Sequence, residues 1–548
     1  MIEIPKKSRP QCRLYRYAKT LFLEVYSRKP QLRITIFPVD SFLAFDPSLW
    51  HTAFKKPQYV LGSHWKKTMS DVETDVLDIV IVGGGISGLA AAWKTQEIAP
   101  ELMVRLYERD NRVGGVLETI HHDGFLIERS ADMFITDLPW AINLCHRLGI
   151  KDELLSSNPV ERRAHVVFRG KIVPIPDGFQ IMGPTRVWPV LISPILSLKG
   201  KCRLFYERFV RRRPPDASEE SLSQFSIRRF GREVFERLIQ PLVGGIYTAD
   251  PDKLSVAAAL PRFIEMEQKH GSIGRGLIAN KQTDQSQAKS HSGARYSLFV
   301  APQLGNEQLV STIASRLQEG VVRKKTSVVG IARGEDSLWQ LKIANGKEVV
   351  CRKLILAIPA HQAAELLLPF DPTLARELEA IVYAGCAVVC LGIARQQFHV
   401  PPSGFGLVVP AVENRRILAI SFSSNKFPGR APEGQLLVRV FFGGACQKEM
   451  MECSDSELTE IAIEELKELL QMTGLPTTHK IVRWPNAMPQ YHVGHNARVK
   501  RIENRVAEIE NLALIGNAYH GVGIPQCIHT AENAVERLLG KSSSTAVR

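Results

Sequence analysis

The sequence lacks the features that mark several special classes of protein. It contains no run of about 18 to 20 uninterrupted apolar residues, so a membrane-spanning helix is not expected. The nine cysteines are an odd number, form no C-x-x-C pair and are spread along the chain, and no signal peptide is expected before them. This pattern predicts reduced, buried thiols, and it supports neither a disulfide framework nor a zinc site.

Catalytic groupings are absent as well. We find no Ser/His/Asp, Cys/His or paired-carboxylate arrangement that we would interpret as a catalytic centre, and no internal repeat. What remains is typical of a large globular protein: 45% of the residues are hydrophobic and 23% are charged. This composition excludes a disordered, fibrous or collagen-like chain. The length of 548 residues predicts roughly three to four domains.

The positive charge is concentrated at one end of the chain. Residues 1–70 hold thirteen Lys and Arg against four Asp and Glu, which is +9 of a total net charge of +14. Nucleic-acid binding is therefore not expected of the rest of the chain. Residues 1–75 show no sustained hydrophobic period, so we expect a basic, poorly ordered extension; a targeting role stays open because the segment is poor in acids.

The strongest local signal is a dinucleotide-binding pattern. The apolar run 77–82 predicts a buried strand, a G-x-G-x-x-G turn follows it, and residues from Leu89 onward predict a helix. Such a turn lets the backbone approach a pyrophosphate, which the helix N-terminus then holds. A second strand ends at Glu108, twenty positions after the last glycine, where a carboxylate would bind a ribose. The predicted turn consists of Gly83, Gly84, Gly85, Ile86, Ser87 and Gly88.

The segments around this pattern favour FAD over NAD. After Glu108 the chain runs straight into a second glycine turn at 112–115, whereas a nicotinamide enzyme would normally continue with another strand and helix. Near the carboxyl end, residues 512–516 predict a strand, and the glycines of 521–525 precede a helix expected to begin near Gln526. A helix start there suits the side of a flavin ring that gains negative charge on reduction. An ordinary surface turn is the alternative.

Several further motifs identify a family. The chain resembles the FAD-linked amine oxidase superfamily and, within it, the oxygen-dependent porphyrinogen oxidases of haem biosynthesis. The resemblance runs in family order from residue 77 to the end, and its most specific stretches are 241–255 and 487–495. The other matching stretches are 112–115, 230–234, 238–247, 269–273 and 521–525.

The resemblance implies a set of cofactor residues beyond the phosphate turn. Glu108 and Arg109 would bind ribose, and other residues would contact the remaining parts of FAD. The sequence departs from the family in four places. Ser130-Ala131 replaces Gly-Pro, 302–305 replaces a glycine pair, and residues 1–75 have no counterpart. Gln526 replaces an acidic or Asn residue at the start of the last helix, where we expect either kind of residue to be able to cap the helix. The remaining implied FAD contacts are Val116, Ser130, Ala131, Asp132, Met133, Val322, Trp484, Val522, Gly523 and Ile524.

The resemblance also implies the reaction. A porphyrinogen would lose six electrons to become a porphyrin, with O2 as acceptor and H2O2 as product, and the flavin would do the redox chemistry. The substrate would be protoporphyrinogen IX or coproporphyrinogen III; Ala164, where eukaryotic members carry Arg, leans toward the latter. Arg163 is a weak candidate for pairing with a substrate propionate. The alternative is that its charge is simply exposed to solvent. The alternatives are a polyamine oxidase or carotenoid desaturase, and a non-enzymatic flavoprotein.

Other candidate sites have simpler explanations. We expect His492, His495 and Cys527 to be packed structural groups. In residues 179–213 an apolar, proline-broken stretch precedes a basic cluster, which suits contact with a membrane surface; a buried helical subdomain with a charged face is the alternative. The protein is expected to be cytoplasmic, with contact to the cytoplasmic membrane left open, and to be a monomer or homodimer.

The expected fold class is α/β. It comprises a discontinuous Rossmann-like FAD domain, a mixed-sheet substrate domain and a helical, membrane-associated subdomain. After the basic extension at 1–75, the FAD-binding domain is expected at 76–150, 295–360 and 485–548. The substrate domain is expected at 151–175, 245–294 and 361–484, and the helical subdomain at 176–244.

Overall fold

The computed structural model describes residues 76–214, 216–279 and 299–540. The described residues all belong to one compact unit. The predicted basic extension lies outside the described residues. The predicted division of the rest into FAD-binding, substrate and helical domains stays a prediction, although the sheets below show how the segments are used.

The first sheet is a seven-stranded, mostly parallel sheet in the order β12-β2-β1-β15-β14-β13, with β21 beside β15. Strands β2, β1, β15, β12 and β21 run parallel where they pair, and β13 and β14 add an antiparallel edge. Its strands come from three distant parts of the chain, which confirms the Rossmann-like architecture. They are β1 (Leu77–Val82), β2 (Val104–Tyr107), β12 (Val322–Arg323), β13 (Val328–Arg333), β14 (Trp339–Ile343), β15 (Glu348–Leu356) and β21 (Leu512–Leu514).

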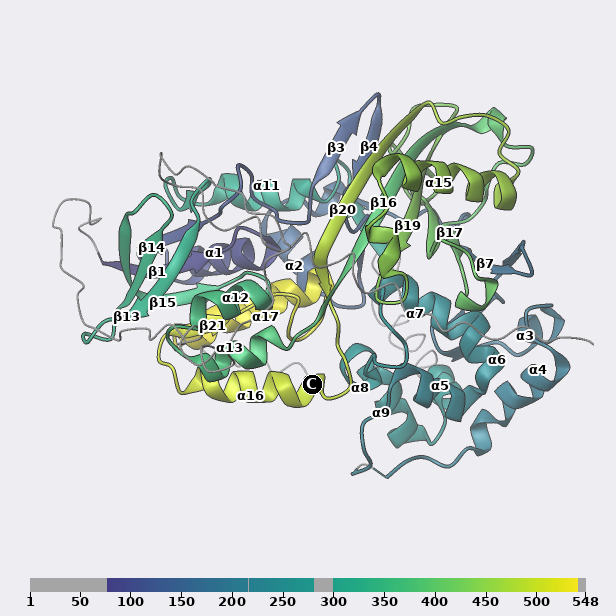
Figure 1. Ribbon diagram of the computed structural model, residues 1–548, viewed down its shortest axis with the longest axis horizontal. Helices are drawn as coiled ribbons and strands as arrows, with labels where there is room; N and C mark the ends of the chain where they lie inside the picture. Colours follow the sequence, from purple (N-terminus) through teal and green to yellow (C-terminus); the bar gives the residue numbers. More distant parts are fainter. Residues whose placement is uncertain (1–75, 215, 280–298, 541–548) are drawn as a thin grey trace, which may run out of the picture. The chain divides into compact units, whose positions relative to one another are not determined.

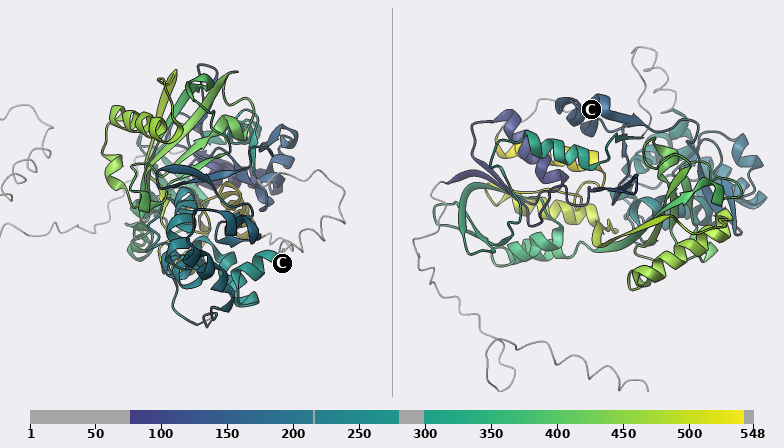
Figure 2. Two further views of the ribbon diagram at one scale, coloured as in Figure 1. Left: turned by 90° about the vertical axis from the view of Figure 1, so that its right-hand side faces the viewer. Right: turned by 90° about the horizontal axis from the view of Figure 1, so that it is seen from above.

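Helices cover both faces of this sheet (Figure 2). Alternate residues of β1 point to opposite sides: Ile79 and Ile81 pack with one set of helices, and Val80 and Val82 with the other. This explains why the strand is apolar without alternation, because both faces are buried. The first set is α1 (Ile86–Ile98), α2 (Trp140–Arg147), α11 (Glu307–Arg316) and α17 (Ile524–Leu538); the second is α12 (Ala360–Leu367), α13 (Pro372–Glu379) and α16 (His495–Ala507).

The second large sheet has the order β20-β16-β19-β18-β17-β7-β8 (Figure 1). One face packs against α15 (Asp455–Leu470), which begins with a capping box of Ser454 and Glu457. The opposite face packs against the hairpin of β3 (Thr119–His122) and β4 (Phe125–Glu128). The strands are β7 (Ala164–Phe168), β8 (Lys171–Pro174), β16 (Tyr383–Ala394), β17 (Gly406–Val408), β18 (Ala419–Phe422), β19 (Gln435–Gly443) and β20 (Thr478–Pro489).

Two small sheets and a short helix accompany the two large sheets. Strand β11 lies between β5 and β6 in a three-stranded sheet, and β9 pairs with β10. Helix α14 follows β18 directly and ends at Lys426. The bounds are β5 (Phe134–Ile135), β6 (Leu154–Ser156), β9 (Phe179–Gln180), β10 (Gly183–Pro184), β11 (Phe299–Pro302) and α14 (Ser423–Lys426).

A group of helices with its own apolar core forms the remaining part of the unit. Its centre holds Arg229, which is fully buried and ion-paired with Glu207 and Glu267. Within the described ranges, no helix is both long and apolar enough to cross a bilayer. The helices are α3 (Trp188–Ile192), α4 (Leu198–Phe205), α5 (Leu222–Phe230), α6 (Arg232–Val234), α7 (Gln240–Tyr247), α8 (Val256–Ala259) and α9 (Pro261–His270), with short helical turns at Tyr206–Phe209 and Phe235–Ile239.

Candidate functional site

The glycine turn between β1 and α1 has the geometry of a phosphate-binding loop. Gly83 has φ +105°, which favours glycine, and a Cβ on Gly88 would lie 2.0 Å from the carbonyl oxygen of Gly83. A Cβ on Gly85, in contrast, would meet no atom within 4 Å. No side chain caps the start of α1 and no acidic residue stands in its first turn. The first amides of the helix are therefore left for an anion.

Glu108 is held beside this turn, just after β2. Its Oε2 accepts a hydrogen bond from the Gly84 amide at 2.7 Å, and its Oε1 accepts one from the Asp110 amide at 2.9 Å. Strand β12 pairs with β2 and brings Val322 opposite Leu106, and the Glu108 amide donates to the Arg323 carbonyl at 2.9 Å. The structure thus brings together Glu108 and Val322, both predicted to contact FAD. Arg109 is exposed.

The second glycine turn lies directly against the first. The Gly114 amide donates to the Gly84 carbonyl at 2.7 Å, and a Cβ on Gly115 would lie 3.4 Å from the Gly85 Cα. Arg112 braces this turn through the carbonyls of Val113, at 3.1 Å, and Gly115. Val116 follows the turn and is 40% exposed. An exposed apolar side chain at this place is consistent with contact to a cofactor.

The carboxyl-terminal glycine loop approaches the same place. Ile524, in the first turn of α17, packs in the core cluster that contains Leu89 of α1. Helix α17 begins at Ile524 and not near Gln526, because Pro525 is tolerated in the first turn of a helix. The expectation that Gln526 could cap it is wrong: the N-cap is Gly523, and no side chain caps the helix. Val522 packs against the core of the helical group.

Cys527 lies in the first turn of α17 and is a packed thiol, as expected. Its side chain is buried, and burial raises the pKa of the thiol to about 11, although the Ser87 hydroxyl lowers it somewhat. Tyr491, which follows β20, ties the preceding loop in place. Its hydroxyl donates to the Asn517 carbonyl at 2.5 Å and accepts from the Gly521 amide at 2.9 Å. The motif at 487–495 and the last glycine loop are therefore one structural unit.

The segment after β4 is fixed by three side chains from distant parts of the chain. Trp484 donates to the Arg129 carbonyl at 2.9 Å, Arg439 to the Ser130 carbonyl at 2.5 Å, and Asn306 to the Ala131 carbonyl at 2.7 Å. Trp484 also carries the Arg129 guanidinium 5.1 Å from its ring centroid. Of these three residues only Trp484 is among the predicted FAD contacts, and its bond to the Arg129 carbonyl was not foreseen.

Ser130 and Ala131 replace Gly-Pro without strain. Neither residue has a positive φ, so the turn does not require glycine. The hydroxyl of Ser130 is buried and has no partner among the described residues. Asp132 is also buried, and its carboxylate is ion-paired with Lys426 at 2.9 Å. Met133 is half-buried, and the next residue, Phe134, packs into the core shared by α1 and α17.

Glu128 is a buried carboxyl that we did not expect from the sequence. It accepts hydrogen bonds from the backbone amide of Asn306 at 2.7 Å and from the Thr119 hydroxyl at 3.0 Å. Burial raises the pKa of Glu128 to about 7, and these two donors and the nearby arginines lower it only in part. Folded protein therefore binds a proton that the unfolded chain releases above pH 4.5.

Replacing Glu128 with Gln is expected to remove a pH dependence of stability. The stabilisation from the raised pKa is fully present below pH 4.5 and is lost as the pH rises through about 7. Relative to E128Q, the wild-type protein should lose up to about 3 kcal/mol in free energy of unfolding between pH 4.5 and pH 8. Urea denaturation of both proteins at these two pH values measures this loss. If the free energies of unfolding of wild type and E128Q differed by the same amount at both pH values, the raised pKa of Glu128 would be contradicted.

The remaining predicted residues do not converge on this site. Arg163 is exposed, and its guanidinium bonds to no described residue, so nothing marks it as a substrate contact. His495 is buried, its ring stacks on Tyr491 at a centroid distance of 4.1 Å, and its Nε2 lies 3.2 Å from the Tyr519 carbonyl. This is the structural role expected of it. His492 is half-buried, and burial lowers its pKa.

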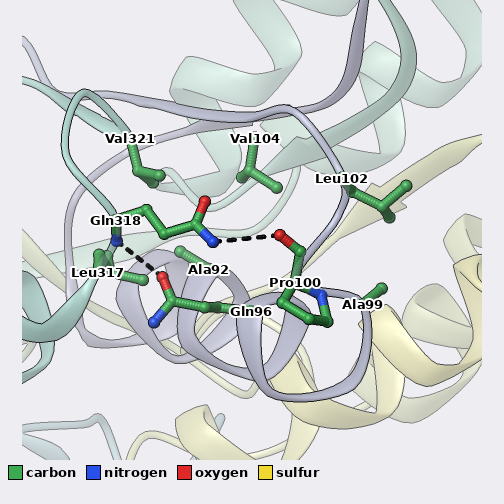
Figure 3. A pocket seen from close by; sticks show the side chains of 9 residues that line it. All are labelled: Ala92, Gln96, Ala99, Pro100, Leu102, Val104, Leu317, Gln318 and Val321. Carbon is green, nitrogen blue, oxygen red and sulfur yellow. Dashed lines mark hydrogen bonds between the residues drawn. The ribbon is translucent and has the colours of Figure 1, made fainter.

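Two hollows elsewhere are not part of the site. The first, of about 10 Å³, lies at the end of α1, where the amides of Gln96 and Gln318 close it by hydrogen bonds (Figure 3). Its volume suffices for about one water molecule. The second is an open groove of about 720 Å³ that no predicted cofactor residue lines. Its walls are Ile227, Arg232, Phe235, Glu236, Gln240, Pro251, Asp252, Ala411, Val412 and Asn414.

The cradle fits FAD. The space in front of Gly85 admits a pyrophosphate, Glu108 is oriented for a ribose, and α17 presents a second uncapped helix start. Two polar atoms, Ser130 Oγ and Gln526 Oε1, are buried in the segments expected beside the flavin ring and bond to none of the residues that the structure describes. Such atoms are ordinarily bonded, so a ligand with donors and acceptors suits them.

Comparison with known proteins identifies a family of flavoproteins. The family described as flavin containing amine oxidoreductase matches residues 86–539. The chain is 32% identical over 466 residues to coproporphyrinogen III oxidase of Bacillus subtilis (strain 168), covering 84% of this chain and 97% of that protein. It is 30% identical over 486 residues to the chloroplastic protoporphyrinogen oxidase 1 of Arabidopsis thaliana, covering 84% and 88%.

Solved structures give the same result. A crystal structure from Exiguobacterium sp. 255-15, assigned as a protoporphyrinogen oxidase, has a TM-score of 0.74 and 28% identity over 85% of this chain and all of that one. The cyclohexylamine oxidase of Brevibacterium oxydans IH-35A shares the fold, with a TM-score of 0.62, 16% identity and coverage of 85% and 99%. The chain therefore belongs to the flavin-containing amine oxidoreductase family and is an FAD-dependent oxidoreductase.

Proposed function

We propose that this chain oxidises a porphyrinogen to a porphyrin in haem biosynthesis, with coproporphyrinogen III as the preferred substrate. The observation that carries the proposal is the 32% identity to coproporphyrinogen III oxidase along 97% of that protein, combined with a glycine turn that leaves room for a pyrophosphate. Protoporphyrinogen IX is the second candidate, because protoporphyrinogen oxidases are similar over the same share of the chain.

The chemistry fits a site without acid or base catalysts. FAD supplies a two-electron acceptor, and three hydride–proton pairs leave the porphyrinogen in turn, with three O2 reduced to three H2O2. The residues of the chain bind, orient and exclude water. Trp484, Arg439 and Asn306 fix the segment beside the flavin, and the uncapped start of α17 favours negative charge near it.

The test is porphyrin fluorescence against time. Purified protein in air receives each porphyrinogen at matched concentration, and autoxidation is subtracted. We expect a fast rise with coproporphyrinogen III, a slower one with protoporphyrinogen IX, and H2O2 in a threefold molar ratio to porphyrin. A protein that binds FAD but oxidises neither porphyrinogen would overturn the proposal, and amines and carotenoid precursors would then be the next substrates to assay.

We also propose that the protein acts in the cytoplasm, as a monomer or homodimer, in contact with a membrane surface. Four apolar side chains of the helical group are 67–80% exposed: Trp188, Ile192, Leu198 and Phe209. Helices α3 and α4, which carry three of them, lie together at the edge of this group (Figure 1). Exposed Lys199, Arg208 and Arg211 flank them, as suits anionic head groups. Lys201 and Arg203 do not contribute, because they bond to the carbonyls of Leu191 and Arg229.

Vesicle flotation tests this contact. The wild-type protein should float with vesicles that contain anionic lipid, less so at high salt, and the double variant W188S/I192S should lose most of the binding. The matched control is V160S, which removes another apolar side chain with 81% exposure. Equal binding by W188S/I192S and wild type would contradict the proposed contact.

A further inference from the structure

Five charged side chains are buried together where β4 meets the second sheet. None is more than 9% exposed. In β19, Leu437 packs toward the β3–β4 hairpin, whereas Val438 and Val440 pack toward α15. Because side chains alternate along a strand, Arg439 lies on the hairpin side, facing the segment after β4. The five residues are Glu128, Asp132, Lys426, Arg430 and Arg439.

Direct contacts join three of the five: Asp132, Lys426 and Arg439. The Lys426 Nζ lies 2.9 Å and the Arg439 Nη1 3.4 Å from the same carboxylate oxygen of Asp132. Arg439 also donates to the Ser130 carbonyl, and Arg430 donates to the carbonyls of Pro302 and Gln303 at 2.8 Å. The cations therefore hold residues 130–132 at two points, the Ser130 carbonyl and the Asp132 carboxylate.

Positive charge exceeds negative charge in this cluster. Three cations face two acids, and burial raises the pKa of Glu128 to about 7, so this carboxyl carries only part of its charge near neutral pH. Asp132 stays ionised: burial alone would raise its pKa, but the charges of Lys426 and Arg439 outweigh burial and lower it to about 2. The net charge is therefore between +1 and +2.

Stability alone does not account for such an arrangement. Buried ions lose their hydration, and replacing a buried ion pair by apolar residues of similar volume is often neutral or stabilising. A fixed charge beside a redox group, in contrast, favours the oxidation state of opposite charge. A flavin ring gains negative charge on reduction, so an excess of buried cations near it would favour the reduced form.

We propose that Lys426 and Arg439, set by Asp132, are positioning residues that hold residues 129–132 for the flavin and, by their excess positive charge, raise its reduction potential. The inference rests on the proposed placement of residues 130–133 beside the flavin ring. It assigns a role to Lys426, at the end of α14, and Arg439, in β19 of the second sheet, both outside every glycine motif of the cofactor site.

Two single variants should shift the potential in opposite directions. Lys426→Met removes a cation and should lower the midpoint potential of the bound FAD, measured by equilibration with a reference dye at one pH. Asp132→Asn removes the anion at nearly constant shape and should raise it. A merely structural role would not give shifts of opposite sign, since both variants break the same ion pair.

Two further variants serve as controls. Lys426→Arg keeps the charge and should retain the wild-type potential. Lys94→Met breaks the 2.7 Å ion pair between Lys94 of α1 and Glu536 of α17. Like Lys426, Lys94 is largely shielded from solvent, but its loss should leave the reduction potential unchanged. Each holoenzyme is first checked for FAD content and melting temperature.

The outcomes separate this inference from the proposed function. Equal potentials in wild type, K426M and D132N, or shifts of the same sign in both variants, would overturn the inference. If one variant fails to fold, the sign of the other shift against K426R still decides. Opposite shifts in a protein that oxidises no porphyrinogen would leave the inference standing and overturn only the proposed substrate.

Discussion

Replacing Gly85 with Asp is expected to give folded protein that purifies without FAD. Gly85 has φ −70° and ψ 178°, a conformation open to any residue, and a Cβ there meets no atom within 4 Å, so the free protein should tolerate the side chain. The new carboxylate would stand where the pyrophosphate is expected. Like charges brought together cost several kcal/mol, so the affinity for FAD should fall by about 1,000-fold or more.

Titration of FAD into apoprotein measures this loss, with circular dichroism and melting temperature as checks on folding. Gly85→Asn, which has the same size without the charge, is the matched control and should lose clearly less affinity. Gly88→Ala should behave differently from both, because its Cβ clashes with the Gly83 carbonyl and distorts the turn itself. Full FAD occupancy in G85D would show that the pyrophosphate lies elsewhere.

Arg229→Met is expected to destabilise the helical group strongly. The Arg229 guanidinium pairs with Glu207 and Glu267 and donates to the carbonyls of Val210 and Gly271. Its loss would leave two carboxylates, only 4% and 2% exposed, without their central partner. Removing one member of a buried ion pair costs about 3–5 kcal/mol.

The measurement is urea denaturation followed by circular dichroism, at pH 7 and with FAD saturating in both proteins. Arg416→Met is the matched control, because its pair with Glu464 is about half exposed on both sides and should contribute less than about 1 kcal/mol. Similar losses in the two variants would show that the Arg229 network is not the main support of this core.

Much of the cofactor cradle could be predicted because its signals are local. The strand, the glycines and the helix follow one another within residues 77–98, and two of the glycines have a local reason: the positive φ of Gly83 and the contact of Gly88 with the Gly83 carbonyl. The capping box at Ser454 and Glu457 was predictable for the same reason. The start of α17 was misplaced by two residues, since proline is compatible with both a loop and a first helical turn.

The sequence by itself determined the nucleotide turn, the buried first strand and the family, because these depend on neighbouring residues and on motif order. It did not reveal Glu128, Asn306, Lys426 or Arg439. Arg439 is a charged residue inside the apolar stretch 436–442, which indicates that a polar or charged partner faces it but does not identify that partner. Only the tertiary structure decided that, since Asp132 and Lys426 are 294 positions apart and meet because the β3–β4 hairpin packs on the second sheet. A contact between residues so far apart leaves no local pattern in the sequence. It can be recognised only once the distant strands are brought together, because a buried charge requires a partner there.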